Sequence, residues 1–499
     1  MKGRDLVAVD VRPLRCVAVA LVLLAPACGP DAEQQPHGAR SDGPGDTARI
    51  GGDDGVGDAD VIDSGQGDLG GGIDPDVGGG AATDGGATDQ GAPDSGGTNV
   101  TPKGPSAAAT KGKHDGVYFW TAPKTPNGLV PTQSWGGVGE APGGEVYATG
   151  MDHVTNSALY RLKSNDVLYY VGDARAASQK ANNWQPGEYA QKFHTRPTEL
   201  KGRIYVATMN SSTLDSSYLK IRGFHWYGYD ANKDVFQDLS AAEPGGVGAA
   251  HGSLVTLAAD RTSSMVYGAM NPTGDLFRYD VAKGKTTKLG RPPYQRPYVY
   301  PGRWMWVDSK GRLYFSAGNS VLSYYGAPYD PAIFNHIRYY DPSTGFGEMK
   351  GWKLTDQRAI DAGQCSGGTC YMMDNLGHIY RFTESGPTWT HVGKVASLPS
   401  GDVESFTWVF AVDFQRLLAY VVIGKGTLFE LDLKTGASSV LGNLRQLEPT
   451  LKNLSRLYGH GAWDGKGRFF FIAFQDGKSQ TNMLLVGIDP VKLKKALGL

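Results

Sequence analysis

Short runs of alternating apolar and polar residues recur along the chain from about residue 113 to its end. One example is GRIYVATM, residues 202–209, which is followed by a second run that closes in WYGYDANKD, residues 226–234. Alternation that ends in Asp and then Gly or Lys in most copies predicts β-hairpins. The aromatic residue at the centre of the first run recurs at intervals of roughly 50 residues. The seven copies are Tyr147, Tyr205, Tyr267, Tyr314, Tyr371, Tyr420 and Phe470.

Each repeat has room for about four strands, and four strands in a repeat of this length are the signature of a β-propeller blade. The sequence therefore predicts an all-β fold in which residues 113–499 form a seven-bladed β-propeller. The segment DGVYFWTAP, residues 115–123, resembles one more strand ahead of the first repeat. Because propellers usually close by pairing strands from both chain ends, we expect this segment to complete the last blade.

The start of the chain carries the pattern of an export signal. Four basic residues precede a run of ten apolar residues, CVAVALVLLA, which is too short to cross a bilayer. We therefore expect residues 1–27 to be a signal peptide that is cleaved before Cys28. The segment LLAPAC resembles a bacterial lipobox with Cys28 as the lipidated residue, while APA also fits an ordinary signal peptidase. Both alternatives predict export. The lipobox alternative also predicts a lipoprotein of the bacterial cell envelope, at the outer membrane or cell surface, that contacts the membrane only through its lipid.

Residues 28–112 separate this signal from the repeats. Between residues 51 and 100 there are 11 Asp but no Lys, Arg or aromatic residue. Such a segment cannot bury a core that offsets the entropy of ordering, so we expect a disordered tether. Because the tether is acidic, the net charge of -1 conceals an excess of about +8 in residues 113–499. This excess permits an anionic partner without requiring one.

A second regularity of the repeats identifies candidate site residues. An acidic residue lies about seven positions before the aromatic residue in six copies, at Glu140, Glu199, Asp260, Asp308, Asp413 and Asp464. Still earlier, near the start of the innermost strand, the repeats carry aromatic or basic residues at Trp135, His194, His251, Arg303, Trp408 and His460. Innermost strands line the channel of a propeller, so these side chains, with the nearby Tyr300, are expected to converge at its mouth. The alternative is that they are ordinary solvated or hydrogen-bonded loop residues.

The blade count, together with His, Tyr and Arg at the mouth, resembles the seven-bladed propeller polysaccharide lyases, of the ulvan lyase and oligogalacturonate lyase kind. This resemblance implies β-elimination next to a uronate carboxylate. Arg303 would neutralise the carboxylate, and His194 or His251 would take the proton. Tyr300 would then protonate the leaving oxygen, and His460 would orient the sugar or bind a metal.

Ligand and metal binding extend this set of candidates. We expect Trp135, Trp408 and His460 to contact a bound ligand. The sequence requires no cofactor, but His194, His251 and His460 could form a three-histidine site for a divalent metal such as Zn or Mn. The repeats lack the Trp-Asp ends of WD proteins, and the chain has no GxSxG nucleophile elbow. We expect a monomer that does not bind nucleic acid.

Cys365 and Cys370, in CSGGTC, are the only cysteines of the predicted propeller. An oxidising compartment favours a disulfide between them. A redox-active or metal-binding pair is the alternative. We expect the bridge to staple the loop that leads into the fifth blade.

The sequence favours a binding protein, which recognises a glycan or protein ligand at the channel mouth, over a polysaccharide lyase. Acid-base catalysis requires His194, His251, Tyr300 and Arg303 to meet near a common point. A binding surface tolerates wider spacing. The positions of these four residues therefore distinguish the two hypotheses.

Overall fold

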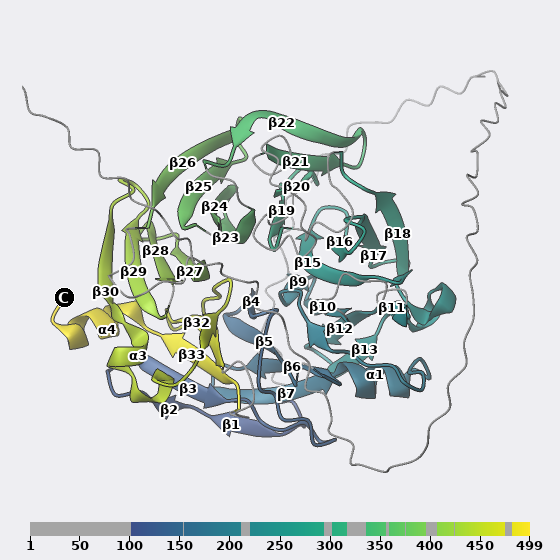
Figure 1. Ribbon diagram of the computed structural model, residues 1–499, viewed down its shortest axis with the longest axis horizontal. Coiled ribbons are helices and arrows are strands. Elements are labelled where there is room, and N and C mark those ends of the chain that lie inside the picture. Colours follow the sequence, from purple (N-terminus) through teal and green to yellow (C-terminus); the bar gives the residue numbers. More distant parts are fainter. Residues whose placement is uncertain are drawn as a thin grey trace, which may run out of the picture. The chain divides into compact units, whose positions relative to one another are not determined.

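The computed structural model describes residues 101–152, 154–210, 220–293, 302–316, 336–355, 359–374, 376–395, 407–423, 425–474 and 482–499, without the side chains of Thr407 and Trp408. These residues belong to one compact unit. In that unit, seven antiparallel sheets follow one another in a ring, each with its first strand toward the axis (Figure 1). The chain is therefore a seven-bladed β-propeller, as the repeats predict.

The first four blades consist of the following strands, in order from the axis outward. They are β4 (Val138–Ala141), β5 (Glu145–Met151), β6 (Ser157–Leu162) and β7 (Val167–Asp173); β8 (Lys192–Phe193) with β9 (Thr198–Leu200), β10 (Arg203–Met209), β12 (Trp226–Asp230) and β13 (Val235–Asp238); β15 (Ser253–Asp260), β16 (Met265–Asn271), β17 (Leu276–Asp280) and β18 (Lys285–Gly290); and β19 (Met305–Val307), β20 (Leu313–Ser316), β21 (His336–Asp341) and β22 (Gly345–Lys353).

The last three blades follow the same order. They are β23 (Ile360–Ser366), β24 (Thr369–Asp374), β25 (His378–Thr383) and β26 (Thr388–Lys394); β27 (Thr407–Asp413), β28 (Leu418–Ile423), β29 (Thr427–Asp432) and β30 (Ser438–Asn443); and β31 (Arg456–Tyr458), β32 (Phe469–Phe474), β33 (Leu484–Ile488) and β3 (Val117–Thr121). A separate two-stranded sheet joins β11 (Gly223–Phe224) to β14 (Ala249–Ala250).

Strand β3 confirms the predicted ring closure. It pairs with β33 from Val117 opposite Ile488 to Thr121 opposite Leu484, so the first part of the propeller supplies the fourth strand of blade 7. Two shorter strands ahead of it, β1 (Ser106–Ala108) and β2 (Thr110–Lys111), add an outer strand to blades 1 and 7 respectively. The segment before β3 therefore covers the outer edges of both blades at the closure.

The hydrophobic core lies between the blades. The repeated aromatic residues fall on the second strand of each blade and are buried there. Tyr205 of blade 2, for example, packs with Leu254 and Phe277 of blade 3. A cluster of this kind lies between each pair of neighbouring blades. The repeat spacing thus reflects packing between sheets, because each sheet must bury both of its faces.

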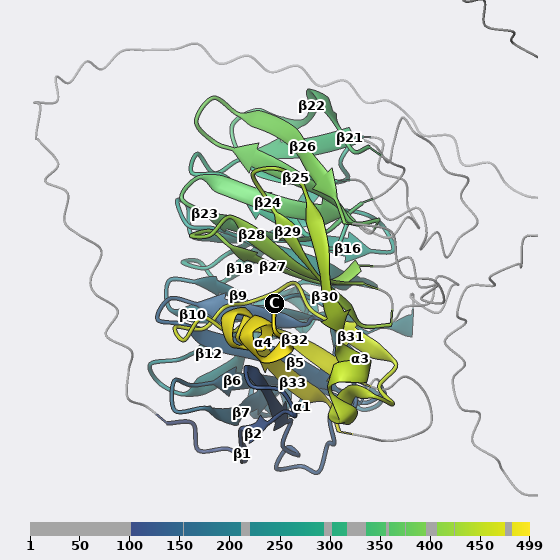
Figure 2. The same cartoon turned by 90° about the vertical axis from the view of Figure 1, so that its left-hand side faces the viewer.

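The few helices lie outside the blades. Among the described residues they are α1 (Ala174–Lys180), α3 (Leu444–Leu447) and α4 (Pro490–Leu497), with the 3-10 turns η2 (Ser240–Ala242), η3 (Pro244–Gly246) and η5 (Pro449–Leu451). The basic tail of the chain forms α4 (Figure 2). Its Leu493 packs into the core between blades 6 and 7. Within the described ranges, no helix is long and apolar enough to cross a membrane.

Candidate functional site

The innermost strands and the segments beside them bring basic residues from three blades together. His194 follows β8, Arg303 precedes β19, and His460 follows β31. All three are buried, with exposed fractions of 5%, 8% and 5%. With Arg196 and Tyr458 they form a polar group that we call the channel cluster. The predicted convergence is therefore found for three of the candidates.

Hydrogen bonds connect blades 4 and 7 inside the channel cluster. Arg303 Nη1 donates to the hydroxyl of Tyr458 over 3.3 Å, and that hydroxyl lies 3.1 Å from His460 Nε2. Since a guanidinium can only donate, the Tyr458 hydroxyl accepts from Arg303 and donates its own proton to His460. The neutral ring of His460 then carries its proton on Nδ1, which has no hydrogen-bonding partner among the residues that the structure describes.

Burial and nearby cations keep the cluster's imidazoles neutral. Burial, followed by the charges of Arg196 and Arg303, holds the pKa of His460 well below its usual range. Burial and the charges of Arg303 and Lys192 likewise hold the pKa of His194 well below its usual range. Burial also raises the pKa of Tyr458, partly opposed by Arg303. At neutral pH the cluster's positive charge therefore resides on its guanidinium groups.

His194 has a defined tautomer. Its Nδ1 lies 3.0 Å from the carbonyl oxygen of Val255, which can only accept, so Nδ1 carries the proton. The lone pair of the neutral ring is then on Nε2. This nitrogen has the chemistry of a general base.

Arg196 reaches across the channel to three other blades. It starts from blade 2, between β8 and β9, and its nitrogens donate to three backbone carbonyls. Nε bonds Val138 O at 3.1 Å, Nη1 bonds Gly363 O at 3.1 Å and Nη2 bonds Gly461 O at 2.9 Å. These acceptors belong to blades 1, 5 and 7. The hydrogen bonds of the guanidinium therefore go to backbone dipoles, while the charge of the Glu140 carboxylate also acts on it.

Two of the predicted catalytic residues are not seen in the cluster. His251 is exposed in the turn between β14 and β15, where its Nδ1 lies 3.0 Å from Ile221 O. No interaction joins it to the channel cluster in the described part of the chain. Tyr300 lies outside the described residues, as does the predicted lipidation residue Cys28.

The predicted ligand-contacting residues have different outcomes. Trp135 is half-buried beside the cluster, with its ring centroid 5.9 Å from that of Tyr458. Trp408 lies on β27, but its side chain is not described. His460 is in the cluster. The three-histidine metal site is not formed, because no group of three His, Cys, Asp or Glu side chains suited to a metal occurs among the described residues.

Sequence reasoning missed Arg196 and Tyr458, although a signal for both exists. Arg196 is two residues after His194, and Tyr458 is two residues before His460. Residues two apart on an extended chain point to the same side. A basic or aromatic residue two positions from His194 and from His460, but not from His251, was therefore the pattern that could have found them.

The repeated acidic residues have a structural role. Asp308 Oδ1 accepts from the backbone N–H groups of Lys310 and Arg312, at 2.9 and 3.0 Å. Asp464 does the same for Lys466 and Arg468. These residues fix the turns between the first and second strands, and such capping explains their regular spacing.

The disulfide between Cys365 and Cys370 is confirmed. Its position differs from the prediction, because the two residues face each other across β23 and β24. The bridge therefore closes the hairpin after the first strand of blade 5 and not the loop that leads into this blade. The physical reason is that the CSGGTC segment itself forms the hairpin turn.

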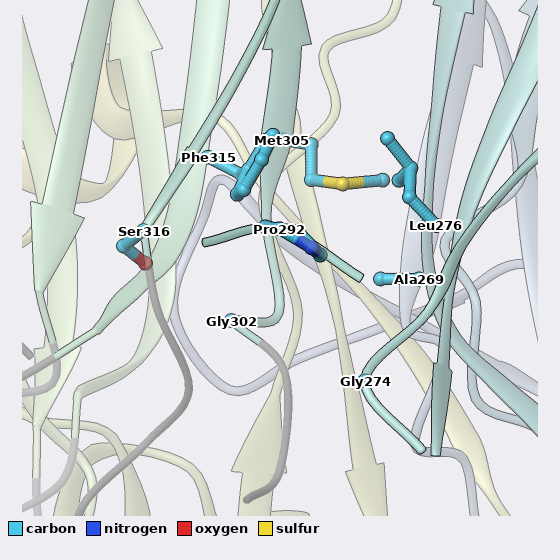
Figure 3. Close-up of a pocket in the computed structure, with 8 residues that line it drawn as sticks. All are labelled: Ala269, Gly274, Leu276, Pro292, Gly302, Met305, Phe315 and Ser316. Carbon is cyan, nitrogen blue, oxygen red and sulfur yellow. The ribbon is translucent and has the colours of Figure 1, made fainter. Parts of the chain in front are cut away.

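The cavity in Figure 3 lies between blades 3 and 4, and its lining residue Gly302 directly precedes Arg303 of the channel cluster. It has a volume of about 20 Å³ and is lined by Ala269, Gly274, Leu276, Pro292, Gly302, Met305, Phe315 and Ser316 of blades 3 and 4 (Figure 3). Pockets for small molecules are far larger and carry convergent polar groups. We therefore take the channel cluster as the candidate site.

Comparison with known proteins concerns the fold alone. No protein-family model and no curated protein matches the chain. Among solved structures, the chain is similar to an oligogalacturonate lyase in complex with manganese, at 9% identity and a TM-score of 0.45, over 79% of this chain and 100% of that one. It is also similar to YCF48 bound to a D1 peptide, at 8% identity and a TM-score of 0.43, over 77% and 99%. PorZ of Porphyromonas gingivalis, a surface component of the type-IX secretion system, has 12% identity and a TM-score of 0.46, over 75% of this chain and 51% of that one. These likenesses add no argument about function.

Proposed function

We propose that this chain is an exported, lipid-anchored β-propeller that recognises a carboxylate-bearing glycan at the mouth of its central channel. The observation that carries the proposal is the pair of guanidinium groups in the channel cluster. Arg196 and Arg303 come from different blades, and the charges of both lower the pKa of His460. Cations held in a buried, water-poor site attract an anion far more strongly than cations on an open surface.

The neighbouring aromatic ring favours a glycan over an acidic peptide. Trp135 is half-buried next to Tyr458, so an aromatic face adjoins the cationic group. Small-ligand sites combine such apolar surfaces with a few charged groups that fix orientation. A uronic acid has a sugar ring that suits the apolar surface and a carboxylate that suits the charged groups. The sequence supports the remaining part of the proposal, since cleavage before Cys28 and lipidation of it would attach the propeller to a membrane through residues 28–112.

Calorimetric titration of the full chain tests this function. The probes are galacturonate oligomers, neutral malto-oligomers and a polyglutamate peptide. We expect binding of the galacturonate oligomers alone and a loss of at least about tenfold in affinity for Arg303→Gln. Arg416→Gln is the matched control, because Arg416 is exposed in the turn after β27. Equal binding of neutral oligomers, or an unchanged Arg303→Gln affinity, would contradict the proposal. Binding of polyglutamate alone would make the partner an acidic peptide.

A polysaccharide lyase is the second candidate, and the tautomer of His194 favours it. A neutral imidazole with its lone pair on Nε2 lies in the same cluster as Arg303. In β-elimination, such a base takes the proton next to the uronate carboxylate while the guanidinium stabilises the developing charge. The bond to the leaving oxygen then breaks, a carbon–carbon double bond forms, and the oxygen is protonated.

The lyase candidate has its own measurement. The unsaturated uronide product absorbs ultraviolet light, so its absorbance is followed with the same galacturonate oligomers, with and without a divalent metal. Absorbance that rises with the unaltered chain and not with His194→Gln supports the lyase. Tight binding without any rise leaves the recognition function alone.

A further inference from the structure

Arg196 and Gln364 form a bridge of side chains across the channel. Arg196 donates to carbonyls of blades 1, 5 and 7 over 2.9 to 3.1 Å. From blade 5, Gln364 Nε2 lies 3.5 Å from Gly461 O of blade 7, and its Oε1 accepts from Val412 N of blade 6 at 2.5 Å. Five of the seven blades are thus joined at this level. We call these two residues the crossbar.

The crossbar lies deeper in the channel than the imidazole of His194. Arg196 follows His194 by two residues, and a strand advances about 3.3 Å per residue. Gln364 is the fifth residue of β23, well past the start of that strand. Gln364 is 4% exposed, whereas Arg196 is half-buried and keeps some contact with solvent. The two side chains therefore span the channel a few ångströms further along the innermost strands than His194, and together they form its floor.

The side chains above the floor are recessed as well. His194, Arg303 and His460 expose between 5% and 8% of their surface. A polymer that lies across the mouth would have to bend its middle residue down between the blades to reach them. A chain end can enter directly, because only one unit has to pass. The floor also prevents a chain from continuing through the propeller.

We propose that the channel cluster recognises the terminal unit of an acidic glycan and not an internal segment. This inference rests on the proposed function, since it specifies which part of the glycan is bound. In this mode of recognition, Arg196 is a specificity-determining residue that limits how far the ligand enters the channel. Three hydrogen bonds to backbone carbonyls hold its guanidinium in place, and its charge, which also acts on Glu140, attracts the ligand.

Counting bound protein per glycan chain tests the inference. The full chain is titrated calorimetrically with short galacturonate oligomers and with polygalacturonate of known chain number. We expect one protein per chain at every length, because each chain offers one matching end. Oligomers whose reducing end has been reduced to the alditol, compared with oligomers whose non-reducing unit is a neutral sugar, then identify which end binds. A number of bound proteins that grows with chain length would overturn the inference while leaving the proposed function intact. Failure of every galacturonate probe to bind would instead refute the proposed function.

A variant examines the crossbar separately. Arg196→Gln removes the guanidinium, and we expect the affinity for oligomers to fall at least about tenfold, with Arg416→Gln as the control. Circular dichroism checks that the variant keeps its strands. An unchanged affinity in a folded Arg196→Gln protein would overturn the role of Arg196. If this variant does not fold, the count of proteins per chain with the unaltered protein still decides the inference.

Discussion

Blade 2 and the channel cluster both contain buried histidines, but the two regions treat them in opposite ways. In blade 2, His225 is 2% exposed and lies between two carboxylates, with Nδ1 at 3.0 Å from Asp238 and Nε2 at 2.9 Å from Glu188. Burial alone would lower its pKa, but the hydrogen bonds to both carboxylates raise it. In the channel cluster, His194 and His460 are similarly buried but have cationic neighbours, and their pKa values are lowered.

This comparison shows that burial does not decide the charge of a histidine. In blade 2 the imidazolium of His225 forms ion pairs with the carboxylates of Glu188 and Asp238. Ser178 and Asn183 also donate hydrogen bonds to Asp238. We call the group of His225, Glu188 and Asp238 the blade 2 clamp. Its charges are compensated within the protein, as expected of a structural unit. In the channel cluster the guanidinium groups lie beside neutral rings, with the charge of Glu140 acting on Arg196 and that of Asp361 on Tyr458.

The largest expected effect comes from breaking the blade 2 clamp. His225→Leu leaves the buried Asp238 carboxylate without its cation and Glu188 with Arg222 alone, and removing one partner of a buried ionic group costs about 3 to 5 kcal/mol. We expect the free energy of unfolding to fall by this amount in urea titrations. His251→Asn is the control, because it changes an exposed histidine at positive φ to a residue that tolerates this backbone, and it should stay within about 0.5 kcal/mol. A His225→Leu protein as stable as the control would show that the clamp is not an ionic unit.

The fold could be predicted from the sequence because the repeated pattern can be recognised within each strand, without knowledge of contacts between blades. Alternation and the recurring aromatic residue determine one blade, and the same pattern seven times determines the ring. Even the closing strand at residues 115–123 was marked by its own alternation. The turn-capping acids, such as Asp308, were equally regular, but their regularity reflected backbone capping and not chemistry.

The site was only partly predictable, because its contacts join different blades. The register of the repeats placed His194, Arg303 and His460 at matching positions, and these do meet. The same register could not exclude His251, since β11 and β14 form a local sheet that places the turn before β15 at the surface. Nor could it indicate the blade 2 clamp. His225 and Asp238 are close in sequence, but Glu188 reaches them only because the chain after α1 folds back onto the blade.

A smaller effect is expected from separating the residues of the channel cluster. Tyr458→Phe removes the hydroxyl that accepts from Arg303 and donates to His460. A buried polar group that loses its partner costs about 1 to 3 kcal/mol. We therefore expect a loss of stability in this range and weaker binding of galacturonate oligomers. The blade 2 clamp should be unaffected, so adding His225→Leu should give an additive loss of stability. A strongly non-additive double variant would mean that the two regions are coupled.

The smallest effect, a change in the slope of stability against pH, compares the two regions most directly. A histidine whose pKa is raised by folding stabilises the protein below its unfolded pKa of about 6.5, and this contribution is lost as pH rises through the folded value. His225 therefore makes stability fall with rising pH above about 6.5. For His194 and His460 the folded pKa is lowered, so the unfolded chain takes up more protons and stability falls as pH decreases below about 6.5.

Urea titrations at several pH values measure these slopes. Below about pH 6.5, the free energy of unfolding should depend less steeply on pH in His460→Gln, by at most about 1.4 kcal/mol per pH unit. Above about pH 6.5, it should depend less steeply on pH in His225→Gln. Because Glu188 and Asp238 have lowered pKa values through their bonds to His225, their contribution is lost only at still lower pH. Slopes that change on the same side in both variants would mean that the two groups of histidines do not have opposite charge states in the folded protein.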